Sequence, residues 1–160
     1  MRIQKIDQMV EMCKEHIAKA EINGTEVESL LTRALLVLLC AAFEKEICCI
    51  IEQRVSSLKD EDAPLVSFFK ACSSSVIRGR KSSALADVLN LFGPEYKNQF
   101  NERKKEHQKE ETYYNNIITN RDTAAHTEDI QMTFSDLEIF YDKGHILLDI
   151  FQETLKKTHL

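Results

Sequence analysis

Residues 30–47 read LLTRALLVLLCAAFEKEI, and this stretch decides the fold of the chain. Every position from 34 to 43 is apolar. Apolar residues continue on both sides at spacings of three and four, from Val27 to Val55, which is the period of an α-helix. A helix that is apolar nearly all round is buried on every side. We therefore predict a helix from about 26 to 56 at the centre of an all-α bundle.

Local signals mark the start of this helix and the helix before it. Apolar residues from Ile3 to Ala20 recur at helical spacing, and Asn23-Gly24 ends that first helix. Thr25 is followed three residues later by Glu28, the pattern of a capping box, in which each side chain bonds the other residue's backbone N–H. The sequence thus predicts two consecutive helices, the second capped by Thr25.

The middle of the chain is expected to hold shorter helices. Residues 56–63 are polar and predict a loop, and Pro64 suits the first turn of a helix of about twelve residues. A short helix from Ser83 to Phe92 is expected to end at Gly93-Pro94. Residues 98–111 are strongly charged, which fits a solvated helix and equally an excursion from the bundle.

Apolar residues at helical spacing return in the last third of the chain. Thr133 and Asp136 form a second capping-box pattern. An apolar stripe from Leu137 to Leu155 then predicts one last helix, with Lys156 in its final turn. We expect an all-α helical bundle of four to five main helices with extra short helices, forming a single domain over residues 1–160.

Composition narrows the class of protein. The chain has 160 residues, of which 43% are hydrophobic and 29% charged, and its net charge of -5 excludes a basic protein that coats nucleic acid. Its five cysteines form no CxxC pair, so we interpret them as core thiols of a reduced, cytoplasmic protein. The charged N-terminus is no signal peptide, and no apolar run is long enough to cross a membrane. We expect no metal site and no cofactor.

One short motif carries chemistry, because phosphate-loop, dinucleotide and metalloprotease motifs are absent from the sequence. Residues 121–126 read RDTAAH, so Arg121 precedes His126 by five positions. A histidine accepts a proton near neutral pH, and an arginine binds a phosphate and stabilises the charge that develops on it. These are the two functions that RNA cleavage without a metal requires. The small Ala124 and Ala125 would let a backbone approach closely.

The geometry of this motif leaves alternatives open. At about 100° per residue, Arg121 and His126 lie about 140° apart on a regular helix. A site therefore needs an irregular helix start or residues from a second subunit. We place the motif at a loop-to-helix junction. The simpler interpretation is a capped helix start with a surface histidine.

RDTAAH, taken with the rest of the chain, resembles the Arg-x4-6-His signature of the HEPN superfamily of small helical nucleases, whose pattern has a polar residue where Asp122 stands. The central helix, with Arg33 and Ala42-Phe43-Glu44, resembles the corresponding HEPN helix. The stretch VIRGRKSSALADVLNLFG at 76–93 and the closing helix resemble a branch found in bacterial defence and toxin loci.

This resemblance implies a metal-independent endoribonuclease that cuts single-stranded RNA, acting as a toxin or antiviral-defence effector. The 2′-OH attacks the adjacent phosphorus and leaves a 2′,3′-cyclic phosphate. His126 would be the general base or acid, Arg121 would stabilise the transition state, and Asp122 would orient or bind. Glu44 would brace Arg121 or His126, with Asn120 and Thr123 as supporting residues. The resemblance also implies a homodimer with a composite active site, and an antitoxin or defence partner protein.

The sequence also offers a candidate RNA-binding cluster and two classes of protein without catalytic activity. Arg78, Arg80 and Lys81 form a small basic cluster that suits RNA phosphates, although a solvated loop is the simpler explanation. The chain also fits a non-catalytic HEPN-like helical module that binds a partner protein or nucleotide, or a plain helical scaffold.

Overall fold

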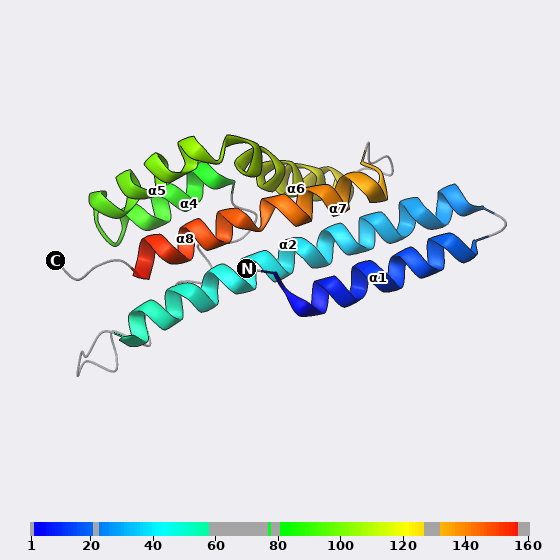
Figure 1. Ribbon diagram of the computed structural model, residues 1–160, viewed down its shortest axis with the longest axis horizontal. Coiled ribbons are helices and arrows are strands. Elements are labelled where there is room, and N and C mark those ends of the chain that lie inside the picture. The colour runs from blue at the N-terminus through cyan, green and yellow to red at the C-terminus, as the bar shows by residue number, and fades with distance from the viewer. Residues whose placement is uncertain (1, 21–22, 58–76, 78–80, 127–131, 157–160) are drawn as a thin grey trace.

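The structure is a computed structural model that describes residues 2–20, 23–57, 77, 81–126 and 132–156. These residues form seven α-helices and no strand (Figure 1), which confirms the predicted all-α class. The helices are α1 (Gln4–Lys19), α2 (Gly24–Ser57), α4 (Ser82–Asn90), α5 (Pro94–Glu106), α6 (Gln108–His126), α7 (Phe134–Gly144) and α8 (Ile146–Lys156). The helix predicted from Pro64 lies outside the described residues. Of the loop predicted at 56–63, residues 56–57 instead belong to α2, and the remainder lies outside the described residues. None of the described helices is long and apolar enough to span a bilayer.

Helix α2 is central, as predicted, because α1, α6, α7 and α8 all pack against it (Figure 1). Its side chains at Leu35, Leu39 and Ile47 are buried in the common core. The prediction of burial all round is nevertheless wrong for one side, where Val37 is 46% and Leu38 is 43% exposed. The described helices pack around the other faces of α2 and leave this side open.

The two predicted capping boxes have different outcomes. The box at Thr133 forms, because its hydroxyl accepts from the Asp136 backbone and the Asp136 carboxylate accepts from the Thr133 backbone. The box at Thr25 is wrong, because α2 already begins at Gly24 and Thr25 lies in its first turn. The Glu28 carboxylate instead accepts a hydrogen bond of 3.2 Å from the Phe134 backbone N–H, so it bonds the first turn of α7.

The predicted last helix is two helices, because α7 ends at Gly144 and α8 begins at Ile146. The chain changes its packing partners here: α7 packs mainly on α6, and α8 packs on α5 and α2. Gly144 is buried directly against the backbone of Tyr114 on α6. A glycine at this point therefore allows close contact between α6 and α7.

The charged segment 98–111 is helical and belongs to the bundle. It forms most of α5 and the start of α6, with a break at His107. Phe100 anchors it, because its ring is fully buried against Phe151 at 6.1 Å between ring centroids. The pattern did not decide between the two alternatives, because Phe100 is the one apolar residue in this segment.

A polar cluster joins α4, α5 and α6. The Ser82 hydroxyl donates to Glu111 at 2.5 Å, Lys104 contacts the same carboxylate at 2.7 Å, and the Ser82 N–H donates to Asn115 at 2.9 Å. Burial opposes the ionisation of Glu111, but the hydrogen bonds from Lys104 and Ser82 lower its pKa overall. The cluster thus holds a charged carboxylate between three helices.

An aromatic cluster fixes α6 and α7 on α2. Phe43 is fully buried, and its ring stacks on Tyr114 of α6 at 5.7 Å between centroids. Tyr141 of α7 lies on Phe43 at 6.3 Å. Aromatic pairs at these separations add to the stability that burial supplies.

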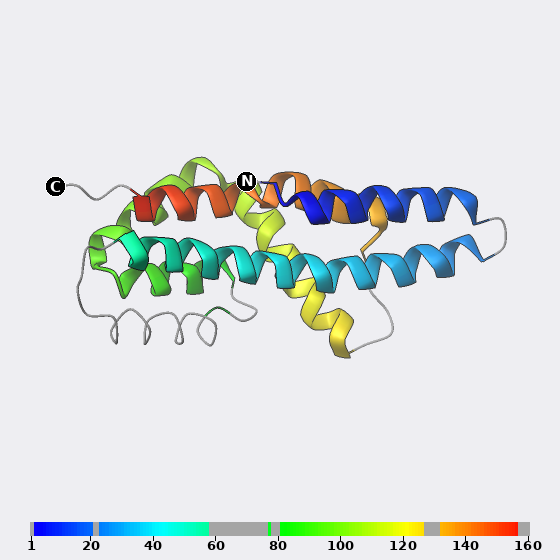
Figure 2. The same ribbon diagram turned by 90° about the horizontal axis from the view of Figure 1, so that it is seen from below.

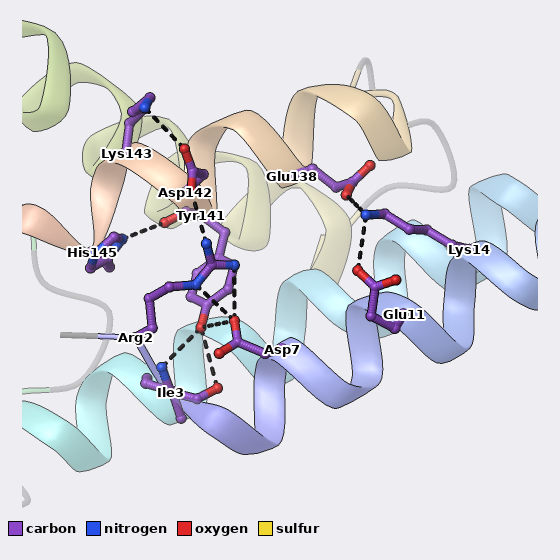
Figure 3. A network of polar contacts seen from close by, with 10 residues as sticks. All are labelled: Arg2, Ile3, Asp7, Glu11, Lys14, Glu138, Tyr141, Asp142, Lys143 and His145. Carbon is purple, nitrogen blue, oxygen red and sulfur yellow. Dashed lines mark hydrogen bonds and ion pairs between the residues drawn. The ribbon is translucent and has the colours of Figure 1, made fainter.

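The N-terminal segment is attached to α7 by the polar network of Figure 3. The Tyr141 hydroxyl accepts from the Ile3 backbone N–H at 2.9 Å and donates to Asp7 at 3.0 Å. Arg2 lies over the Tyr141 ring and bonds both Asp7 and Asp142. Residues 2–7 and 141–142, which are far apart in the sequence, therefore hold α1 and α7 together.

We predict that Gly144→Ala destabilises the fold by about 1–2 kcal/mol, because overpacking costs more than the helix propensity gained. A Cβ atom at 144 would lie 3.0 Å from the Tyr114 backbone N, and a backbone atom within a packed helix shifts less easily than the end of a side chain. Gly24→Ala is the matched control, because nothing lies within 4 Å of its added Cβ. Urea unfolding measures both variants. An unchanged or higher midpoint for Gly144→Ala contradicts the close contact.

Candidate active site

The Arg-x4-His motif lies in the last two turns of α6, so the expected loop-to-helix junction is wrong. The helix continues through residue 120, and polar side chains in this region bond back to their own helix. Asn120 donates to the Asn116 carbonyl at 2.8 Å, and Thr123 donates to the Thr119 carbonyl at 3.3 Å. Figure 2 shows α6 crossing α2, with its C-terminal turns extending beyond α2 on the side away from α1.

Arg121 is held between two carboxylates. Its Nη1 lies 2.9 Å from Asp122 Oδ1, and its Nη2 lies 3.4 Å from Glu44 Oε1 on α2. The hydrogen bond with Asp122 and the charge of Glu44 raise the pKa of the guanidinium. The Arg121 side chain remains 32% exposed, so its guanidinium can meet a ligand. The structure thus brings together three of the predicted site residues.

Other predicted site residues take different positions. His126 is the last residue of α6, and its side chain lies outside the described part of the structure. Lys81 is exposed at the N-cap of α4, and no described contact joins it to Arg121. Arg78 and Arg80 lie outside the described residues.

Two α2 residues that the motif did not indicate also contact α6. The Arg33 guanidinium donates to the Ala124 carbonyl at 3.2 Å, and the Cys40 thiol contacts the Ile117 carbonyl at 3.7 Å. Arg33 and Cys40 are seven residues apart, and Cys40 and Glu44 are four apart. These spacings place all three residues within about 20° of one line along α2. This spacing is the signal in the sequence that could have found them.

The Cys40 thiol is not a nucleophile in this arrangement. Burial raises its pKa to about 12, although the Arg121 charge acts in the opposite direction. At neutral pH the thiol is therefore protonated and serves as a hydrogen-bond donor inside the core.

Hollows also lie at other places on the described surface. One of about 430 Å³ lies between α1 and α7, where Arg2 pairs with Asp7 and Lys14 pairs with Glu138 (Figure 3). Its cations already have carboxylate partners. Another of about 310 Å³ lies beside Arg33 and is lined by Thr25, Glu26, Ser29 and Leu30. Within the described residues, no three His, Cys, Asp or Glu side chains lie close enough together to hold a metal ion.

An all-helical bundle with an Arg-x4-His motif is what the resemblance to HEPN proteins predicts. The chain matches the model of the HEPN_RiboL-PSP family, described as RiboL-PSP-HEPN, over residues 2–157. The chain therefore belongs to this HEPN family. No curated protein and no solved structure matched the chain.

We predict that Cys40 resists alkylation by iodoacetamide at pH 8 in the folded protein. A pKa of about 12 in place of 9.0 lowers the thiolate fraction about 1,000-fold. Because the pKa of Cys40 is raised in the folded state, the protonated thiol contributes fully to folding stability below pH 9. The free energy of unfolding then falls as the pH rises from 9 toward 12. Peptide mass spectrometry compares native with urea-unfolded protein. Equal labelling of Cys40 in both states contradicts its burial.

Proposed function

We propose that this chain is an endoribonuclease that cleaves single-stranded RNA without a metal. The observation that carries the proposal is Arg121, which the Glu44 carboxylate of α2 holds in the same helix end that contains His126. Arginine and histidine together supply phosphate binding, charge stabilisation and proton transfer. Membership of the HEPN family supports this reaction class.

In the proposed reaction, the neutral His126 imidazole takes the proton of a ribose 2′-OH. The 2′-oxygen attacks the adjacent phosphorus, and the bond to the 5′-oxygen breaks. That oxygen leaves as a 5′-OH after it receives a proton, and the phosphate remains as a 2′,3′-cyclic diester. The Arg121 guanidinium binds the non-bridging oxygens, on which negative charge increases. Asp122 and Glu44 orient the guanidinium.

The helical geometry favours a site shared by two subunits. In a regular helix, Arg121 and His126 point about 140° apart, so one α6 does not direct both side chains at one phosphate. Because α6 remains helical up to residue 126, an irregular helix start is not the solution. A second copy of the chain would supply the missing group.

An exposed apolar stripe on α2 supports pairing with a second copy. Leu30 is 68% exposed, Val37 46% and Leu38 43%, and Ala34 and Ala41 are also exposed. Contiguous apolar surface of this kind marks interaction sites. The stripe is nearly symmetric about the midpoint between 37 and 38, because Ala34 mirrors Ala41 and Val37 mirrors Leu38. It therefore fits a second α2 that runs antiparallel across a two-fold axis.

The same pairing would bring the two α6 ends together. Arg33 and Glu44 lie on opposite sides of the stripe's midpoint and on the same edge of α2. In an antiparallel pair, Arg33 would therefore lie beside Glu44 of the partner subunit. The turn that carries His126 would then face Arg121 of the partner subunit, which is the composite arrangement that the reaction needs.

A non-catalytic helical module that binds a partner protein or nucleotide is the second candidate. The carboxylates around Arg121 favour it, because they already neutralise the guanidinium that would bind phosphate. The role of toxin or defence effector, with an antitoxin or defence partner protein, belongs to the nuclease proposal. Growth arrest on expression of the parent chain but not of the His126→Ala variant would support that role.

We predict that the purified protein cleaves single-stranded RNA in the presence of EDTA and leaves 2′,3′-cyclic phosphate ends. His126→Ala and Arg121→Ala should each lower kcat at least about 100-fold, because each removes one chemical function. DNA of the same sequence should resist, because it lacks the 2′-OH. Mapping of the product ends and single-turnover rates measure these effects.

His16→Ala is the matched control, because it removes an exposed histidine on α1 and should leave the rate unchanged. Full activity in both the His126 and Arg121 variants would refute the site. Loss of cleavage in EDTA, or equal cutting of DNA, would refute the mechanism.

We predict that the double variant Ala34→Cys, Ala41→Cys forms a covalent dimer under mild oxidation. An antiparallel pair places residue 34 beside residue 41 of the partner subunit, within reach of a disulfide. In Ala34→Cys alone, the two new cysteines would lie about 10 Å apart along the helix axis, too far for a bond.

Non-reducing electrophoresis measures the dimer, and the parent chain controls for the natural cysteines. A double variant that stays monomeric, or a single variant that cross-links equally well, rules out this pairing. The measurement requires no nuclease activity.

A further inference from the structure

The C-terminal turn of α6 depends on a contact from another helix. The last four carbonyls of any α-helix lack partners within the helix. In α6, which ends at His126, the Ala124 carbonyl is one of these. Ala124 is only 7% exposed, so water has little access to it. Arg33 of α2 supplies a donor from outside the helix, with Nη2 at 3.2 Å from the carbonyl oxygen.

An arginine suits this position for two physical reasons. Its positive charge is favourable at a helix C-terminus, where the unpaired carbonyls carry partial negative charge. Its planar guanidinium has several donors in a fixed arrangement, so one bond to the carbonyl also sets the direction of the others. Arg33 therefore holds the backbone of the final turn of α6 in place, in addition to carrying a charge.

The hydrogen bond from Arg33 to Ala124 lies within the Arg-x4-His motif. Ala124 precedes His126 by two residues within the same final turn, and it follows Arg121 by three. Glu44 holds the side chain of Arg121, while Arg33 holds the backbone next to His126. Two residues of α2 thus hold the two halves of the motif, across 91 and 77 positions of sequence.

We propose that Arg33 is a positioning residue that fixes the final turn of α6 and thereby sets where the His126 imidazole lies. The geometry alone supports the effect of Arg33 on the turn, whereas the effect of Arg33 on cleavage rests on the proposed function. Arg33 acts through the Ala124 carbonyl rather than on the reacting phosphate. Small displacements of a catalytic group lower the rate strongly while substrate binding persists.

The proposal predicts a split between kcat and KM. In Arg33→Gln, kcat should fall at least about 10-fold while KM changes less than about 2-fold, because the histidine is misplaced but RNA contacts persist. Arg33→Lys keeps a charged donor and should recover part of the rate. A rise in KM with unchanged kcat would overturn positioning and indicate an RNA-binding role instead.

Hydrogen exchange tests the same proposal without any activity. Arg33→Gln should speed amide exchange in the final turn of α6 at least about 5-fold, with the rest of α6 unchanged. Arg54→Gln is the matched control, because Arg54 lies on the same helix but contacts the Tyr96 hydroxyl at 3.3 Å. It should leave the α6 turn unchanged.

Unchanged exchange in the α6 turn of Arg33→Gln would overturn the proposal. Faster exchange there, with Arg33→Lys close to the parent, supports it. If the parent chain cleaves no RNA but the exchange result holds, the proposed function fails while the role of Arg33 in holding the turn stands. A general increase across all helices would show a folding defect and would also overturn a local role.

Discussion

The contact of Phe43 with Tyr114, on which its ring stacks, and with Tyr141, against which its ring is tilted, is the contact on which the candidate site depends. It fixes α6 and α7 on α2 at one level of the bundle, and Glu44 follows Phe43 directly. The Glu44 carboxylate therefore projects from α2 at the point where α6 crosses it. There it pairs with Arg121, which lies two helical turns after Tyr114 on α6. A fully buried ring has little freedom to shift, so the separation of α2 and α6 is set by packing rather than by the ion pair.

Much of the fold could be predicted from the sequence, because helical spacing and local capping rules are encoded in neighbouring residues. The central helix and the Thr133 capping box are examples. The break after Gly144 could not be predicted in this way, because the apolar stripe continues through it and only the approach of Tyr114 gives the glycine its role. The segment 98–111 was undecided for a similar reason: one buried ring, Phe100, attaches it to the bundle.

The candidate site was predictable to a smaller extent. The spacing of Arg121 and His126 is local and visible, and a carboxylate within an apolar helix suggested a role for Glu44. Arg33 was not found as a site residue. The sequence shows only that it shares one line of α2 with Glu44; its contact with a backbone carbonyl 91 positions away is set by the fold. The expected loop-to-helix junction was wrong: Asn120 and Thr123 are residue types that favour helix ends, but here they lie within α6 and bond back to carbonyls of their own helix.

The pairing of Arg121 with two carboxylates has a consequence for how salt would affect RNA binding. One positive and two negative charges leave the cluster without long-range attraction for a phosphate, and the chain carries a net charge of -5. Proteins that bind nucleic acid through many cations release condensed counterions and weaken steeply as salt rises. For the proposed reaction, few ions would be released, so binding would depend weakly on salt. Choice among RNAs would then rest on close fit around the scissile phosphate.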